Sequence, residues 1–179
     1  MADTALAPSS TPAQSCANPP GPKAKIALLE NSGEELYEAA AQGDLDKVRA
    51  LCLEWAGNES VLNWSNSGGD TPLNIACWYD HCEVVSALIG TAGVNVNMAN
   101  INCCSPLWVS AANGSTNTVR VLLSAKDRGL DLNQKNNHGD TPLRRARENN
   151  NNAVVTLLEE AGATEEGKAF WWWWWRWRW

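Results

Sequence analysis

The stretch "GGDTPLNIACWYDHCEVVSALI", residues 69–90, decides the fold. Turn residues come first, and Thr71 followed by Pro72 is typical of a helix N-cap and first helical position. Two short apolar-striped segments follow, separated by the turn-tolerant Asp80. Trp78 and Tyr79 are neighbours just before this break, although only one of two adjacent helical residues can face a core. The pair therefore requires an explanation other than core packing.

The same pattern occurs twice more along the chain. The prolines at 72, 106 and 142 stand in T-P-L, S-P-L and T-P-L, and they are 34 and 36 residues apart. Aligned on them, residues 69–90 match "CCSPLWVSAANGSTNTVRVLL" and "HGDTPLRRARENNNNAVVTLL". Each copy predicts a turn, a capped first helix, a break at Asp80, Gly114 or Asn150, and a second helix with one apolar face. This period indicates stacked units that bury each other's apolar stripes.

The pattern resembles the ankyrin repeat, whose signature motifs are present as "NSGGDTPLNIA", "DHCEVV" and "NNHGDTPLRRA". Residues 33–53 have the same helix–Gly–helix order without T-P-L and are similar to an N-terminal capping unit. The resemblance covers roughly residues 33–163. It is weakest in the third unit, where Cys103 replaces the turn glycine and Ser110 the usual Ala. Asn74 and Trp108 stand where the family usually has His, so the inter-repeat hydrogen bond of that His is not assured.

We therefore expect an all-α fold, an ankyrin-repeat α-solenoid of about four units. Five of the eight prolines fall in the first 22 residues, a composition that cannot bury enough apolar surface to order itself. A plastid transit peptide is the alternative for residues 1–25, although they contain no Arg. The expected segments are a disordered arm at 1–30, a capping repeat at 31–64, repeats at 65–99 and 100–134, a C-terminal repeat at 135–166 and a Trp/Arg tail at 167–179.

Composition and charge exclude several classes of protein. The net charge of −6 argues against nucleic-acid binding. Residues 65–99 hold three acids and no Lys or Arg, whereas Arg144, Arg145 and Arg147 cluster near the end. Six cysteines without a C-x-x-C pair, together with only two His, predict no metal site and reduced thiols. The absence of a secretory leader and of an 18-residue apolar run predicts a cytoplasmic or nuclear protein, which we expect to be monomeric.

An enzyme is not expected, and neither is a cofactor. The chain contains no P-loop, no G-x-S-x-G and no H-E-x-x-H. Asp80, His81 and Cys82 are adjacent at one helix start, whereas catalytic groups converge from separate elements.

The resemblance implies that partner contacts come from the turn tips and the exposed side of each first helix. Trp and Tyr give a large contact area at low rotamer cost, so Trp78 and Tyr79 are the expected hot spot. The alternative is that Trp78 packs against Trp108 between units. The surface is polar and mildly acidic, which favours a polar or basic protein or peptide. The other candidates are Ser67, Asp70, Ile101, Asn102, Cys104, Asn113, Asn137, His138, Asp140, Glu148 and Asn149.

The final stretch, "FWWWWWRWRW", offers an alternative function. Trp favours the membrane–water interface and Arg favours anionic headgroups, so the chain could be a peripheral membrane adaptor that docks through its tail. The competing interpretation is a translated simple repeat of low complexity, because the Trp codon is one base from two Arg codons.

Overall fold

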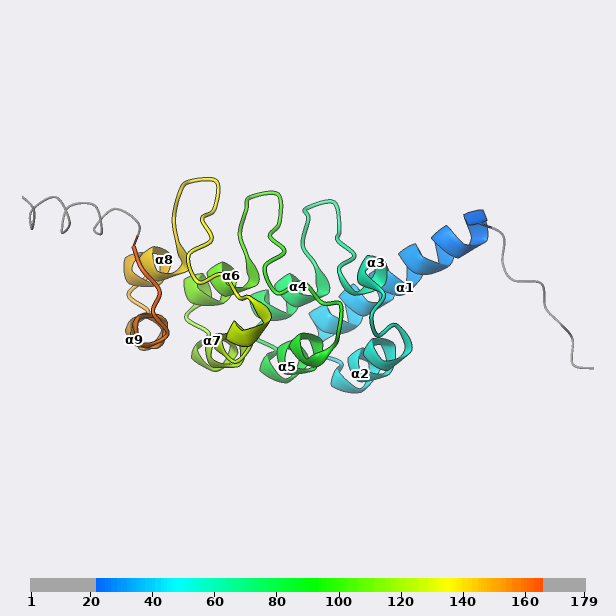
Figure 1. Ribbon diagram of the computed structural model, residues 1–179, viewed down its shortest axis with the longest axis horizontal. Coiled ribbons are helices and arrows are strands. Elements are labelled where there is room, and N and C mark those ends of the chain that lie inside the picture. Colours follow the sequence, from blue (N-terminus) through cyan, green and yellow to red (C-terminus); the bar gives the residue numbers. More distant parts are fainter. Residues whose placement is uncertain (1–21, 166–179) are drawn as a thin grey trace, which may run out of the picture.

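The computed structural model describes residues 22–165, and it shows two layers of helices with three loops protruding on one side (Figure 1). This arrangement confirms the expected all-α solenoid. Each unit contributes one inner and one outer helix, and successive units pack side by side. The inner helices are α1 (Pro22–Gln42), α4 (Pro72–Trp78), α6 (Pro106–Asn113) and α8 (Pro142–Glu148), and the outer helices are α2 (Leu45–Glu54), α5 (Cys82–Gly90), α7 (Thr116–Leu123) and α9 (Asn152–Glu160).

The proline-marked helices begin as the sequence predicts. The side chains of Thr71, Ser105 and Thr141 each accept a hydrogen bond from the backbone N–H three residues later. The following proline occupies a position whose N–H would have no helical partner. The predicted breaks are also confirmed, because residues 80, 114 and 150 all adopt left-handed φ angles of 60°, 76° and 59°.

Three loops, which we call the first, second and third fingers (residues 66–70, 100–104 and 136–140), precede α4, α6 and α8. In each finger the first residue is Asn, and its side-chain oxygen accepts two backbone N–H bonds of 2.9–3.1 Å from that finger. Backbone bonds also join neighbours, since Ile101 donates to Gly68 at 3.1 Å and Asn137 donates to Asn102 at 3.0 Å. The fingers therefore form one hydrogen-bonded series.

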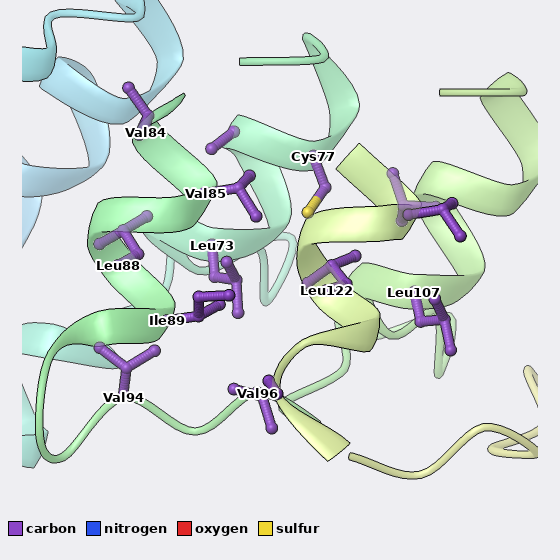
Figure 2. Close-up of a cluster of buried hydrophobic side chains, with 14 of the residues drawn as sticks. Leu73, Cys77, Val84, Val85, Leu88, Ile89, Val94, Val96, Leu107 and Leu122 are labelled. Atoms are coloured by element: carbon purple, nitrogen blue, oxygen red, sulfur yellow. The ribbon is translucent and has the colours of Figure 1, made fainter. Parts of the chain in front are cut away.

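The core lies between the two helical layers and continues from unit to unit. Figure 2 shows Leu73 and Cys77 of α4 beside Val85 and Leu88 of α5, with Leu122 of the next unit close to them. These side chains are completely or almost completely buried. The small residues Ala76, Ser110 and Ala146 are also fully buried, which lets inner and outer helices approach closely.

Asn74 and Trp108 both bond to backbone of the segment that leads into or forms the next finger, although neither is the usual His. Asn74 donates through its amide to the backbone oxygen of Met98 at 3.0 Å. The Trp108 indole N–H donates to the backbone oxygen of Asp140 at 3.1 Å. Both side chains thus supply a donor that reaches the backbone at or just before the next finger.

The structure differs from the expected segments at the N-terminal end. Helix α1 begins at Pro22, so residues 22–30 are helical and not part of a disordered arm. The local sequence "KAKIALL" consists mainly of good helix formers, which outweigh the proline-rich composition of the preceding residues. Residues 1–21 of the expected arm and the Trp/Arg tail lie outside the described residues. Within residues 22–165, no helix is long and apolar enough to cross a membrane.

Two short helices were not expected, α3 (Glu59–Leu62) and the 3₁₀ helix η1 (Lys126–Arg128). Helix η1 accommodates the longer proline spacing of the third unit. It also places Arg128 against the end of α5, where the guanidinium donates to the backbone oxygens of Ile89, Thr91 and Val94.

Candidate partner-binding surface

The fingers and the inner helices α1, α4, α6 and α8 lie on the same side of the layer of outer helices (Figure 1). We call this side the finger–helix face. The outer helices form the opposite layer, so the two layers present different residues to solvent. Because the inner helices pack in sequence, equivalent positions of the units form rows across the face.

Trp78 and Tyr79 lie on this face with 58% and 55% of their surface exposed. Trp78 is the last residue of α4 and Tyr79 is its C-cap. The Tyr79 ring lies 6.0 Å, centroid to centroid, from the ring of His81, whose Nε2 is 3.1 Å from the backbone oxygen of Ala41. The Asn113 amide donates to the backbone oxygen of Trp78 at 3.0 Å. The two rings therefore lie outside the core, and contacts from both neighbouring units fix the backbone around them.

Trp108 packs in another way. Its ring lies 4.9 Å from the guanidinium carbon of Arg145, in addition to the indole bond to the third finger. Among residues 22–165, no ring contact joins Trp108 to Trp78. The proposed inter-repeat packing of Trp78 on Trp108 is therefore not the arrangement that these rings adopt.

The counterparts of the aromatic pair in the later units carry no large apolar side chain. The Asn149 amide donates to the backbone oxygen of Ala112 at 2.7 Å, as that of Asn113 does to Trp78. Glu148 forms ion pairs with Arg144 at 3.0 Å and Arg145 at 3.4 Å. The pattern of amide bonds between units thus repeats along the face, while the large aromatic contact area at these positions is confined to α4 and its C-cap.

Most of the predicted finger residues are exposed. Ser67, Asn102, Asn137 and His138 face solvent, and Ile101 is 66% exposed. The Asn137 amide donates to the backbone oxygen of Ile101 at 3.0 Å, which fixes the tip of the second finger against the third. Asp70 is half-buried, and one of its carboxylate oxygens accepts a bond of 2.9 Å from Asn100.

Two of the predicted contact residues require correction, because they are buried. Cys104 is 8% exposed and Asp140 is 6% exposed. The Asp140 carboxylate turns toward α8 and pairs with Arg144 and Arg145, at 3.1 Å in each case. Burial raises the pKa of the Cys104 thiol, which donates to the backbone oxygen of Asn102 at 3.7 Å. Neither side chain offers a partner much surface.

An acidic stripe lies along the exposed side of α1, within and just before the capping repeat. Glu30, Glu34 and Glu38 are all exposed, and they lie on the side of the helix away from the buried Leu36 and Ala40. Their four-residue spacing was a usable signal, since residues i and i+4 lie on one helical face. Glu34 and Glu38 belong to the capping repeat, and Glu30 extends the stripe along the part of α1 that was expected to be a disordered arm.

Three other features of the described residues were considered as reactive or ligand-binding sites, and none is arranged as one. The thiol of Cys77 is fully buried, and burial raises its pKa to about 12. Residues 22–165 contain no group of three His, Cys, Asp or Glu side chains placed to hold a metal ion. An open depression of about 500 Å³ lies beside α3, but the Asn63 amide that lines it is already bonded to Gly93 and Asn95.

Comparison with known proteins agrees with this geometry. Family models described as ankyrin repeats match residues 57–108 and 92–166. The ANK repeat-containing protein nipk-1 of Caenorhabditis elegans is 37% identical over 114 residues, which are 60% of this chain and 18% of that protein. A probable serine/threonine-protein kinase of Dictyostelium discoideum is 29% identical over 128 residues, 69% of this chain and 15% of the kinase. The probable E3 ubiquitin-protein ligase XBOS32 of rice is 37% identical over 93 residues, 51% of this chain and 18% of the ligase.

The matched segment spans less than a fifth of the length of each of these three relatives. The kinase and ligase names describe whole proteins, of which the similar part is the repeat region. Ankyrin repeats are non-catalytic modules that generally bind other proteins. With capped inner helices, hydrogen-bonded fingers and family matches that together extend over residues 57–166, this chain belongs to the ankyrin repeat family.

Proposed function

We propose that the chain binds a partner protein or peptide on the finger–helix face, acting as a monomer, with Trp78 and Tyr79 as the hot spot. The observation that carries the proposal is the exposure of two adjacent large aromatic side chains, 58% and 55%, above a complete core. The exposed finger tips at Ser67, Ile101 and Asn137 extend the surface toward the partner.

The backbone of the pair is already fixed, which lowers the cost of binding. The segment between α4 and α5 is fixed at both ends. Asn113 of the following unit donates to the backbone of Trp78, and His81 contacts the backbone oxygen of Ala41 in the preceding unit. A partner that covers the two rings therefore orders little more than their side chains, and rigid surfaces of this kind lose less entropy on association. Truncation of a hot-spot aromatic residue to Ala costs about 2 kcal/mol or more of binding free energy.

The test is affinity capture with the wild-type chain and with the Trp78→Ala/Tyr79→Ala double variant, with bound proteins identified by mass spectrometry. The matched control is Leu53→Ala, which removes an 82% exposed apolar side chain from α2 in the opposite layer. We expect a specific partner to be lost from the double variant and kept by the control. Thermal unfolding of all three proteins separates binding from folding. Equal capture by the double variant, or equal loss with the control, would refute the proposal.

A further inference from the structure

The stripe of Glu30, Glu34 and Glu38 has no counter-charge within residues 26–165. None of the three carboxylates forms an ion pair with another residue of that range. Glu35, on a neighbouring side of the same helix, does pair with Lys47 at 3.0 Å. Lys47 of α2 thus pairs with the side of α1 that faces α2, whereas the three carboxylates of the stripe face solvent.

The unit that packs against α1 through α4 is also acidic. The sequence contains no Lys or Arg between Arg49 and Arg120, so no fixed positive charge occurs in the unit that carries Trp78 and Tyr79. The acidic residues of that unit are Asp70, Asp80 and Glu83. Like-charged surroundings make a positively charged partner favourable and repel a negative one.

The stripe and the aromatic pair form one surface, because α1 packs directly against α4. Trp78 is equivalent in the repeat to Ala41, which lies about one turn beyond Glu38 on α1. Packed helices have axes about 8–10 Å apart, so an exposed Trp78 ring is within reach of a ligand that also contacts Glu38. The small side chain of Ala41 does not extend into the space between them.

We infer that the partner presents a basic helix, with Lys or Arg every four residues, that lies along α1 and places apolar or cationic side chains on Trp78 and Tyr79. The inference rests on the proposed function and specifies its partner. Acids four residues apart on α1 recur about every 6 Å, and cations four residues apart on a second helix recur at the same distance. A cation over the face of Trp or Tyr gains further attraction from the ring.

The test uses a defined probe, an amidated and fluorescently labelled Ala-based helical peptide of about 20 residues with Lys at every fourth position. A second peptide of identical composition distributes the Lys residues around the helix. Binding is measured by fluorescence anisotropy against the full chain, at low and at high NaCl concentration. We expect the first peptide to bind more tightly than the second, and its affinity to fall with salt.

The variants are Glu34→Gln/Glu38→Gln and a charge-matched control, Glu54→Gln/Glu160→Gln, on the outer helices. An exposed ion pair is worth about 1.4- to 5-fold in affinity, so loss of two pairs should make the stripe variant bind the striped peptide about 2- to 25-fold more weakly. The control should bind it as wild type does. Equal affinities of the two variants, or equal binding of the two peptides, would overturn the inference.

Two further outcomes separate this inference from the proposed function. If the partner captured by wild type is lost from the Trp78/Tyr79 variant but kept by the stripe variant, the hot spot stands and the basic helix is refuted. If the chain self-associates, and both deletion of residues 167–179 and the stripe variant abolish the association, the Arg-containing tail of a second copy covers the stripe, which also overturns the inference.

Discussion

Asp80 and Asn150 occupy the same position in two units and have nearly the same left-handed backbone, with φ of 60° and 59°. The equivalent residue in the unit between them is Gly114. Left-handed φ costs a non-glycine residue roughly 1 kcal/mol, somewhat less for Asp and Asn. No side-chain hydrogen bond holds Asn150 among the described residues. Glycine's greater freedom in the unfolded chain offsets part of the relieved strain, so Asn150→Gly should stabilise the protein by up to about 0.5 kcal/mol.

The same substitution at Asp80 should have the opposite sign. The Asp80 carboxylate accepts a hydrogen bond of 2.6 Å from the hydroxyl of Thr118, which is fully buried. A hydrogen bond to a charged group contributes about 1.5–3 kcal/mol, which exceeds the strain that glycine relieves. Asp80→Gly should therefore destabilise the protein by about 0.5–2 kcal/mol.

The assay is urea unfolding followed by circular dichroism at 222 nm, on Asp80→Gly, Asn150→Gly and the conservative control Asp80→Asn. In a Thr118→Val background the hydrogen bond is already absent, so Asp80→Gly should become stabilising like Asn150→Gly. This double-mutant cycle separates the free energy of the Thr118–Asp80 hydrogen bond from that of the backbone strain at residue 80. If Asp80→Gly stabilises the wild-type protein as much as Asn150→Gly does, the reasoning from backbone and hydrogen bond is refuted.

Three other substitutions test separate contacts. Cys103→Gly should raise the free energy of unfolding by about 1 kcal/mol, because this exposed cysteine has a left-handed φ of 57°, and a decrease in a urea titration would contradict this. Burial raises the pKa of Cys77 from 9.0 to about 12, so the thiol favours the folded state below pH 9 and this stability is lost as pH rises toward 12. Cys77→Ala, which introduces the residue found at the equivalent position Ala111, should flatten the decline in unfolding free energy between pH 9 and 11, and an unchanged pH profile would exclude the thiol as its source. Arg128→Ala removes the donor to three carbonyls at the end of α5 and should lower the melting temperature by a few degrees, about 1–2 kcal/mol, whereas an unchanged temperature would show that water replaces the guanidinium.

The architecture was predictable because its signals are local. Thr71, Ser105 and Thr141 cap helices through the backbone three residues later, and Pro at the first helical position needs no partner. The breaks at Asp80 and Asn150 follow from residue types that tolerate left-handed backbone. Once the proline spacing aligned these signals, stacking followed from the apolar faces alone.

The candidate surface was predictable only in part, because exposure depends on contacts between units. Asp140 and Cys104 occupy the same finger position as Asp70, yet Asp140 is buried against Arg145 and Cys104 against its neighbouring units. Contacts between units join residues about thirty apart in the chain, and no local pattern reveals them. The bonds of Asn63 to Gly93 and of Asn97 to Gly129, 2.7 Å each, are of the same kind.

These contacts between units also determine how the binding surface should behave. In stacked repeats each unit contacts only its neighbours, so a substitution affects the units beside it more than distant ones. The backbone oxygen of Trp78 is held by Asn113, and the second finger is bonded to the first through Ile101. The proposed hot spot therefore depends on the third unit as well as its own, although the left-handed Cys103 costs that unit's finger some stability. Loss of binding after a change in the third unit can arise from displacement of Trp78, and only variants at the aromatic rings themselves test contact directly.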